Sequence, residues 1–451
     1  MLEKLFAPQS VCIVGASHSE EKLGGVVLRN LLRSKSLKIF PITPQQGSLM
    51  GVPALKNISG LPGKVDIAII IRPAAEVSGI LEELRGKTRF VIIVSAGFTE
   101  AGRGDLQEEV KRTAAFAGIR IIGPNCMGIY NAINGFDTFI LPPERVPRPQ
   151  KGNIGFTTQS GAVLGILFES LCASGTGISA AAHYGNAADL DECDFYSHFA
   201  GDPHTKAVIS YLESVRDGRR FLEHAAKLAA AGKPLLVLKA GKAPTGQSAA
   251  FSHTGRLAGS YEVFSSVLKQ LGITEVLDIE ELADGAKGLS VSRTNPLKSS
   301  GRKKILVLTN AGGAGVLASD ECAKRGTELP PLPPESLRRL KEKLPDFYGF
   351  GNPFDLTAQV RDEDYGVVLE ELAPHYDGFL IIALSAVRGI TERLAGILAK
   401  FNAANGKPVV LQTGADPVGK TIVSGAEAAG IPALPSPERA AKVLGVLLGA
   451  N

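Results

Sequence analysis

A histidine stands in a long run of small residues, a setting in which its imidazole could act as a nucleophile carried on a loop. Of the eighteen residues 243–260, twelve are Ala, Gly, Ser or Thr, and this run contains His253. Small side chains favour a loop that can approach one partner and then another, and a neutral imidazole is a nucleophile near pH 7. The pattern fits a group carried on His253, although a lone histidine in a Gly/Ser loop is also an ordinary surface residue.

Two further groups are predicted to lie together at the edge of one sheet. The β-rich run 207–211 leads directly into Glu213, and Gln159-Ser160-Gly161 follows another β-rich run and begins a helical pattern. A carboxylate can orient an imidazole through its second N–H, and a helix N-terminus can hold phosphate or acyl oxygens. Taken alone, Glu213 also fits a surface acid, and Ser160 fits a plain N-cap.

A glycine-rich turn near the start of the chain is a candidate phosphate site. Gly15-Ala16-Ser17 ends the first β-rich run, and Lys22 and Gly24 stand just before a helical run. Free backbone N–H groups, the positive helix end and the lysine charge favour a phosphate there. The turn departs from G-x-G-x-x-G, and no acid follows the second run to hold a ribose, so a dinucleotide is disfavoured. A tight turn that needs small residues for packing is the alternative.

The elements that must position these groups follow one pattern three times. SVCIVGAS (10–17), GNIGFTTQSG (152–161) and KKILVLTNAGG (303–313) each combine a β-rich run, a Gly/Ser-rich turn and a helical period. Further strands alternate with helices, which predicts the α/β class with doubly wound parallel sheets. Twelve strands are expected, at 11–15, 38–42, 65–71, 90–95, 120–123, 152–157, 178–183, 207–211, 234–239, 305–309, 378–384 and 408–412.

Pro-, Ser- and Arg/Lys-rich stretches predict the domain boundaries. LPPERVPRPQKG (141–152) and VSRTNPLKSSGRKK (291–304) lack an apolar period. We therefore expect three α/β domains, at 1–145, 146–298 and 299–451. In such sheets, ligands bind beyond the carboxyl ends of the strands.

The composition excludes several other function classes. A net charge of +4 on 451 residues is too small for a nucleic-acid footprint. No stretch approaches the roughly 18 apolar residues that span a bilayer, so no membrane partner is expected. Five widely spaced cysteines favour reduced thiols and a cytoplasmic location. Cys193, His198 and His204 match no closed zinc spacing, so no metal is expected on this chain.

Several motifs, in one order along the chain, carry a family resemblance. They are GASHSEEKLGGVVLRNL, SAGFTEAG, GPNCMGIYN, TTQSGAV, GNAADLDECDF, YLESVRDGRRF, SHTGRLAGS, NAGGAGVLASDECAKRG and GNPFDLT. This set resembles the alpha subunit of NDP-forming acyl-CoA synthetases, relatives of succinyl-CoA synthetase whose commonest form is ADP-forming acetyl-CoA synthetase. The resemblance runs from about residue 5 to the end of the chain. It implies that the domain at 1–145 is a Rossmann-like, CoA-binding domain and that the domains at 146–298 and 299–451 are flavodoxin-like.

The resemblance implies a role for each matching residue. His253 would be phosphorylated during turnover, and Glu213 would orient its ring. CoA would bind at Gly15, Ala16, Ser17, Lys22, Gly24, Ser95, Ala96, Gly97 and Asn125. Phosphate would bind at the helix start formed by Gln159, Ser160 and Gly161. Three residues depart from the family pattern: Gln45 replaces a cationic contact to CoA, and Arg256 and Ala314 replace a small residue and a proline.

The resemblance also implies a partner. The family's nucleotide site lies in an ATP-grasp domain, and three α/β domains already use the whole chain. An ATP-grasp beta subunit, holding ADP or ATP with Mg²⁺, would complete acyl-CoA + ADP + phosphate ⇌ acid + CoA + ATP, with two copies of each subunit expected. A CoA- or acyl-CoA-sensing module that regulates a partner is the main alternative, and a dinucleotide redox enzyme is a weaker one.

Gly165 is the residue from which the acid is predicted. It lies four residues after Gly161, about 40° round the expected helix, and a mid-helix glycine costs about 1 kcal/mol relative to alanine. Either the helix packs closely on its sheet there, or the missing side chain leaves room for the acyl group. Its neighbours are apolar, so the second explanation predicts an apolar monocarboxylate, such as acetate or a larger branched or aromatic acid, in preference to succinate.

Overall fold

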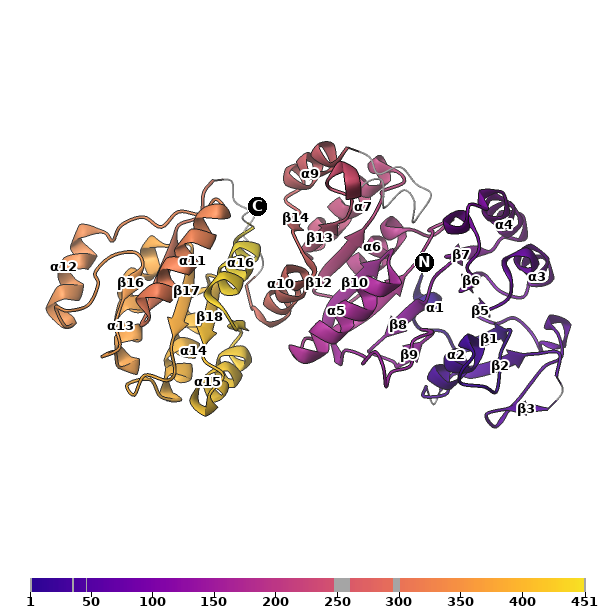
Figure 1. Cartoon of the computed structure of the whole chain (residues 1–451), viewed down its shortest axis with the longest axis horizontal. Helices are drawn as coiled ribbons and strands as arrows, with labels where there is room; N and C mark the ends of the chain where they lie inside the picture. The colour runs from indigo at the N-terminus through magenta and orange to yellow at the C-terminus, as the bar shows by residue number, and fades with distance from the viewer. Residues whose placement is uncertain (1, 35, 46, 247–259, 295–300, 450–451) are drawn as a thin grey trace. The chain divides into compact units, whose positions relative to one another are not determined.

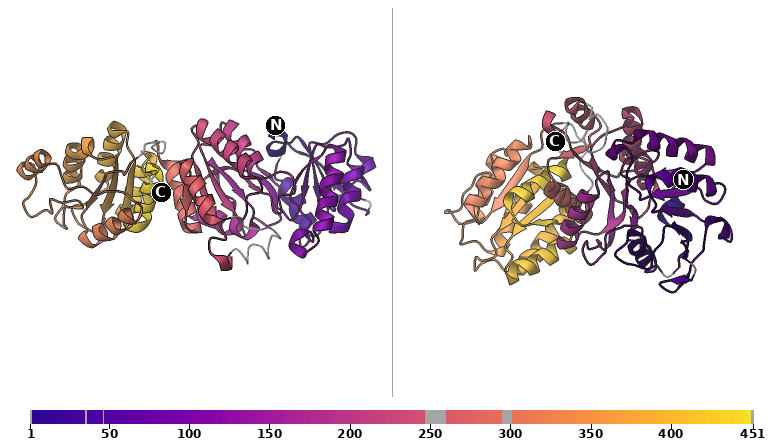
Figure 2. Two further views of the ribbon diagram at one scale, coloured as in Figure 1. Left: turned by 90° about the horizontal axis from the view of Figure 1, so that it is seen from above. Right: turned by 45° about the vertical axis from the view of Figure 1, so that its right-hand side comes forward.

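The computed structural model describes residues 2–34, 36–45, 47–246, 260–294 and 301–449. The chain divides into two compact units, residues 1–271 and 272–451. In each unit helices lie on both sides of the strands (Figures 1 and 2), and the pairing is mostly parallel. The predicted α/β class with parallel sheets is confirmed. The predicted boundaries of the three domains, at 1–145, 146–298 and 299–451, stay a prediction.

The first sheet has five parallel strands in the order β2-β1-β5-β6-β7. Its strands are nearly continuous apolar runs because helices cover both faces. Alternate residues such as Cys12 and Val14 join the core of α3 and α4, to which Leu81 and Val110 belong. The elements are β1 (Ser10–Val14), β2 (Lys38–Ile42), β5 (Ile67–Ile70), β6 (Phe90–Ile93), β7 (Arg120–Ile122), α1 (Glu3–Phe6), α2 (Leu23–Leu31), α3 (Val77–Glu83) and α4 (Gly104–Ala117), with the small hairpin β3 (Ser48–Leu49) and β4 (Val52–Pro53).

Six strands of the second sheet run in the order β13-β12-β10-β11-β8-β9. Phe199 of α6 lies against Gly155 of β10, where a Cβ would come within 2.9 Å of the ring. Phe168 of α5 packs on the other face, with its ring centroid 6.3 Å from that of Phe156. The elements are β8 (Gly128–Asn131), β9 (Phe136–Asp137), β10 (Lys151–Thr158), β11 (Ile178–His183), β12 (Ala207–Leu212), β13 (Leu235–Lys239), α5 (Gly161–Ala173), α6 (Glu192–Gly201), α7 (Gly218–Ala230) and α9 (Tyr261–Gln270).

Strands β8 and β9 were not expected. They pair antiparallel, β8 with β11 and β9 with β8, so this sheet is mixed. Both strands are short, and they lie within the range predicted for the first domain. The chain therefore enters the second sheet at Gly128, well before the Pro-rich stretch that follows.

The irregular segment 186–190 covers the free edge of β7. The backbone N–H groups of Asn186, Ala188 and Leu190 donate to the carbonyls of Pro124, Gly123 and Ile121, at 3.0, 2.9 and 3.1 Å. An exposed edge strand presents unpaired backbone groups, and this segment pairs them. The turn that follows β7 is thereby held by a loop that follows β11.

The second unit contains a five-stranded parallel sheet in the order β16-β15-β17-β18-β19. Helix α16 packs with α10 and α11, and α14 packs with α13 and α15. One large core cluster of this unit includes Leu306, Phe354, Phe379 and Leu411. The elements are β14 (Thr274–Val276), β15 (Ile305–Thr309), β16 (Phe354–Asp355), β17 (Gly378–Ala383), β18 (Val409–Thr413), β19 (Ala433–Leu434), α10 (Ile279–Val291), α11 (Gly312–Lys324), α12 (Pro334–Lys343), α13 (Asp362–Leu372), α14 (Arg393–Asn405), α15 (Pro417–Ala428) and α16 (Pro437–Leu448).

Candidate active site

The glycine-rich turn after β1 is held tightly by backbone contacts. A Cβ on Gly15, which has φ +97°, would lie 2.2 Å from the carbonyl oxygen of Ile71, and one on Gly24 would lie 2.1 Å from the carbonyl oxygen of Gly15. Packing alone therefore requires both glycines. The N–H groups of Gly15 and Ala16 donate to the carbonyl of Ile42 at 3.2 and 3.3 Å, so they are not the free donors that the sequence suggested.

Around this turn, the remaining predicted phosphate donors lie closer to solvent. Ser17 Oγ accepts the N–H of Ser19 at 3.1 Å. Lys22 is exposed and directly precedes the first residue of α2, so its charge stands at the positive end of that helix. Gln45, after β2, is exposed as well. CoA binding at this turn stays a prediction.

The turn after β6 presents the next predicted CoA contacts. Ser95 is buried and its Oγ accepts the N–H of Arg72 at 3.2 Å, whereas Ala96 is exposed. Gly97 has φ +102°, a conformation that favours glycine, and its N–H donates to Glu100 Oε1 at 2.6 Å. The turn is thus anchored at both ends with its tip in solvent.

Asn125 lies beside that turn, although thirty residues separate it from Ser95 in the sequence. Its N–H donates to the carbonyl of Ser95 at 2.9 Å, and its backbone is left-handed, with φ +56°. The neighbouring Cys126 is buried, and burial raises the pKa of its thiol well above the usual range. A buried thiol of this kind is unreactive.

Gln159 connects the start of α5 to Glu213. Its side-chain Oε1 accepts the N–H groups of Glu213 at 2.6 Å and of Ser214 at 3.0 Å, and its Nε2 donates to the carbonyl of Ser214 at 2.9 Å. All three groups are buried. One amide therefore fixes the backbone that carries the Glu213 carboxylate.

The surroundings of Glu213 restrict its carboxylate further. The side chain is buried, and Lys239 Nζ donates to the Glu213 carbonyl at 2.7 Å. Burial raises the pKa of Tyr211 to about 12, together with the charge of Glu213 and a hydrogen bond to it. Since the neutral hydroxyl is the donor in that bond, Tyr211 holds the carboxylate as an acceptor.

His183, on β11, joins two of the predicted binding turns. The N–H of Met127 donates to His183 Nδ1 at 2.8 Å, so the ring proton is on Nε2, which donates to the carbonyl of Gln159 at 3.1 Å. Burial lowers the pKa of His183 to about 4, and the bond to Gln159 only partly opposes this. A neutral imidazole therefore links the turn at Asn125 to the start of α5.

The first turn of α5 has the features of an anion site and of a packed helix end. Ser160 is the N-cap, and its Oγ accepts the N–H of Val163 at 3.4 Å. A Cβ on Gly161 would lie 2.6 Å from Met127 Cε, so the end of that methionine side chain would have to shift to admit one. A Cβ on Gly165 would meet Val146 Cγ2 at 3.9 Å, an ordinary contact, and among the described residues no other atom outside the helix's own backbone lies within 4 Å of it. Close packing on the sheet therefore does not explain Gly165.

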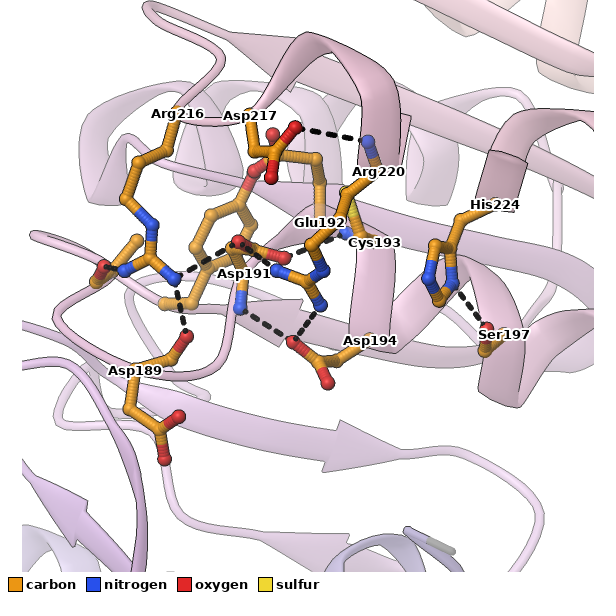
Figure 3. A network of polar contacts seen from close by, with 12 residues as sticks. Asp189, Asp191, Glu192, Cys193, Asp194, Ser197, Arg216, Asp217, Arg220 and His224 are labelled. Carbon is orange, nitrogen blue, oxygen red and sulfur yellow. Dashed lines mark hydrogen bonds and ion pairs between the residues drawn. The ribbon is translucent and has the colours of Figure 1, made fainter. Parts of the chain in front are cut away.

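Beyond Glu213, a network of ion pairs holds the loop at 185–191, as Figure 3 shows. Arg216 donates to the carbonyls of Ala187 and Ala188, both at 3.0 Å, and lies 3.5 Å from the Asp191 carboxylate. Arg220 contacts Asp191 at 2.8 Å and also Asp194 at 3.1 Å. These arginines come from the segment after Glu213, so the same segment carries the carboxylate and holds the loop.

The structure brings most predicted site residues to two connected edges, and His253 and Arg256 lie outside the described residues. Ala314, in α11, is half-buried, and nothing in the structure explains its replacement of proline. Among the described residues, no group of three or more His, Cys, Asp or Glu could hold a metal ion. His198 instead stacks on Phe6, with ring centroids 3.9 Å apart. The described helices include none with the length and apolar character needed to cross a membrane.

Sequence reasoning missed the residues that hold the site. The side-chain roles of Glu100, His183, Asn186 and Arg216 appear only in the fold, since the contacts that join them to other elements reach across 24 to 86 residues. Asn186 and Arg216 stand within motifs that had been singled out, GNAADLDECDF and YLESVRDGRRF. Polar residues within those motifs were the available signal.

Three family models match consecutive parts of the chain: a CoA binding domain at residues 9–132, a succinyl-CoA ligase like flavodoxin domain at 151–289 and a ligase-CoA domain at 305–371. The alpha subunit of ADP-forming acetate–CoA ligase II of Pyrococcus furiosus is 36% identical, covering 97% of this chain and 95% of that protein. ADP-forming acetate–CoA ligase I of Archaeoglobus fulgidus is 38% identical over 82% of this chain but 53% of its own length.

A solved structure agrees over the whole chain. Acetyl-coenzyme A synthetase 1 of Ca. Korarchaeum cryptofilum, described as dinucleotide forming and determined with phosphate and ADP, has a TM-score of 0.86 and 34% identity, covering 100% of this chain and 97% of that one. The chain spans about half of the Archaeoglobus ligase and nearly all of the Pyrococcus alpha subunit. The expected resemblance is confirmed: the chain belongs to the family of ADP-forming acetate–CoA ligase alpha subunits.

Proposed function

We propose that this chain is the alpha subunit of an ADP-forming acyl-CoA synthetase, which catalyses acyl-CoA + ADP + phosphate ⇌ acid + CoA + ATP. The observation that carries the proposal is the Gln159 amide, which ties the N-terminus of α5 to the backbone of Glu213. An anion-binding helix end and an orienting carboxylate thereby stand at one sheet edge, as transfer of a phosphoryl group to a histidine requires.

The reaction divides into three transfers. Phosphate attacks the thioester carbon near the start of α5, the C–S bond breaks, and CoA leaves as an acyl phosphate forms. The imidazole of His253 then attacks phosphorus, and the acid leaves with the bridging oxygen. Finally, the phosphoryl group passes from His253 to ADP, which forms ATP and restores the neutral ring. Glu213 orients the imidazole and stabilises its positive charge while it carries the phosphoryl group.

Binding is shared among the predicted turns. CoA contacts Gly15, Ala16, Ser17, Lys22 and Gly24 after β1, Ser95 to Gly97 after β6, and Asn125 after β7. Phosphate contacts Gln159, Ser160 and Gly161. The N–H groups of Gly15 and Ala16 already donate to the carbonyl of Ile42. The charge of Lys22 and the positive N-terminal end of α2 therefore attract the phosphates of CoA there.

The nucleotide belongs to the partner. An ATP-grasp beta subunit holds ADP and Mg²⁺, and the assembly contains two copies of each subunit. This division is supported by the Archaeoglobus ligase, of which this chain spans about half. We further propose an apolar monocarboxylate as the acid, because the described atom that a Cβ on Gly165 would meet is the apolar Cγ2 of Val146, at 3.9 Å. We also propose a cytoplasmic location.

The test is phosphorylation of His253. The chain, assembled with an ATP-grasp subunit, is incubated with labelled ATP and Mg²⁺, and the label on the chain is expected to be acid-labile and base-stable. His253→Ala should abolish it, whereas His204→Ala, a change at an exposed histidine, should leave it intact. A label that survives His253→Ala would refute the assignment.

The sensing-module alternative is not favoured, because the relatives and the solved structure described above are all ligases or synthetases. The same preparation separates the two: a sensor would bind CoA without forming ATP from acyl-CoA, ADP and phosphate. Steady ATP formation that depends on His253 supports the enzyme.

A further inference from the structure

Asn186 lies between the two turns that are proposed to bind CoA. Its Nδ2 donates to Glu100 Oε2 at 2.6 Å and to Gln107 Oε1 at 3.0 Å. Its Oδ1 faces Asn125 Nδ2 at 3.5 Å, and its backbone N–H donates to the carbonyl of Pro124. One buried side chain from the loop after β11 thus contacts residues from both turns of the first sheet.

Glu100 links Asn186 to the turn after β6 through hydrogen bonds to its two carboxylate oxygens. One carboxylate oxygen, Oε1, accepts the N–H groups of Gly97 at 2.6 Å and Phe98 at 3.2 Å, while the other accepts from Asn186. Burial acts to raise the pKa of Glu100, but the hydrogen bonds from Asn186, Gly97 and Phe98 outweigh it and lower the pKa. The carboxylate therefore stays charged, and its orientation fixes the orientation of Gly97.

Asn186 itself is held from outside the first sheet. A Cβ on the preceding Gly185 would lie 2.0 Å from the carbonyl oxygen of Asn125, so the loop lies directly on that turn. Arg216 holds the following carbonyls of Ala187 and Ala188, and Figure 3 shows the same guanidinium contacting Asp191. The loop is thereby held on both sides of Asn186, so the Asn186 side chain has a fixed position from which it can hold the two turns.

We propose that Asn186 is a positioning residue for CoA, which acts through Glu100 and Asn125 to hold the turns after β6 and β7 at the separation that CoA needs. The inference rests on the proposed function, since it assumes that these turns bind CoA. It adds a specific consequence: a change at Asn186 alters CoA affinity and leaves phosphoryl transfer between ATP and His253 unchanged.

A donor–acceptor exchange provides the test. Asn186→Asp places a carboxylate against Glu100 Oε2, and Glu100→Gln places an amide donor against the Asn186 amide. The double variant Glu100→Gln/Asn186→Asp restores one donor and one acceptor, and the amide oxygen introduced by Glu100→Gln still accepts the N–H groups of Gly97 and Phe98. Asn134→Asp is the matched control, because Asn134 Nδ2 donates to the carbonyl of Phe6, away from both turns.

Two measurements are made on the assembled enzyme: initial rates with CoA varied at saturating acid and ATP, and labelling of His253 by ATP without CoA. Asn186→Asp should raise the KM for CoA by about tenfold or more, since the new carboxylate repels the carboxylate of Glu100 and removes the hydrogen bond that Glu100 accepts from Asn186. Labelling should stay within about twofold of the parent. The double variant should return the KM to within about threefold of the parent, and Asn134→Asp should not change it.

Three results would overturn the inference. They are a parental KM for CoA in Asn186→Asp, a double variant no better than the worse single variant, and a loss of labelling that matches the rise in KM. The last would indicate general damage to the fold. A parent enzyme that is not labelled at His253 would instead refute the proposed function, and the inference would fall with it.

Discussion

Replacing Gln159 by Leu tests whether this side chain fixes Glu213. Leu fills a similar volume but has neither the acceptor used by the N–H groups of Glu213 and Ser214 nor the donor used by the Ser214 carbonyl. Three buried hydrogen bonds are lost, each contributing about 1 kcal/mol net, so the free energy of unfolding should fall by about 3 kcal/mol. For a unit of this size that corresponds to a melting temperature about 6–12 °C lower.

The same change should slow catalysis, because the segment that carries Glu213 loses its anchor. We expect labelling of His253 by ATP to be about 10–100-fold slower, which is the usual effect of losing an orienting contact. Gln159→Glu separates the two effects. It keeps an acceptor for both N–H groups and so the anchor of the Glu213 backbone, but it loses the donor to Ser214 and buries a second negative charge near Glu213, so stability should fall while the anchor is kept.

Thermal unfolding followed by circular dichroism measures the first effect, and single-turnover labelling with ATP measures the second. Gln150→Leu is the matched control, since Gln150 is exposed and its side chain makes one hydrogen bond to the described residues, from Nε2 to the carbonyl of Gly175 at 3.0 Å. If Gln159→Leu unfolds at the same temperature as Gln150→Leu and is labelled at the parental rate, Gln159 does not position Glu213.

Three further predictions follow from the other groups. Because the pKa of His183 is about 4 in the folded chain and about 6.5 unfolded, the unfolded chain binds more protons between these values, so stability should fall by up to about 3 kcal/mol from pH 7 to pH 4. Equilibrium unfolding across this range should show a shallower dependence in His183→Gln, and parallel profiles would contradict it. Glu213→Gln should be labelled about 10–100-fold more slowly, with parental CoA affinity in calorimetry; a parental rate would exclude the orienting role. Gly165→Ala should fold with equal or slightly higher stability, and Gly165→Val should lower kcat/KM for larger acyl-CoAs more than for acetyl-CoA, by about 1–3 kcal/mol; equal losses on all acyl-CoAs would remove Gly165 from the acyl site.

The regular elements could be predicted because local pattern determines them. All twelve expected strands are present within a few residues of their predicted ends, since each is an apolar run closed by a turn. Strands β8 and β9 could not be predicted, because GIYN and FD are short and their antiparallel pairing depends on β11. The edge of β7 is likewise covered by a segment more than sixty residues away in the chain.

The place of a site residue could be predicted where the residue directly follows a strand. It could not be predicted where the residue's role depends on a contact with a residue far away in the sequence. Glu213 and Ser160 follow strands, so their place at one sheet edge could be derived. Gln159 was expected to bind phosphate, and its observed contacts to Glu213 and Ser214 span 54 and 55 residues. No spacing rule predicts such a contact, because it depends on which strands lie side by side.

The two halves of the proposed reaction have separate supports in the fold, and one residue connects them. Asn186 holds the turns proposed for CoA, whereas Gln159 holds the backbone of Glu213 on the phosphoryl side. His183 joins these halves, because it accepts from Met127, next to the turn at Asn125, and donates to the carbonyl of Gln159. A thioester and a phosphate must meet at a fixed separation for the first transfer, and misplacement by about 1 Å costs about 100-fold in rate. We therefore expect His183 substitutions to lower the rate of acyl phosphate formation more than they change either CoA affinity or labelling by ATP, a combination that neither Asn186 nor Gln159 variants should show.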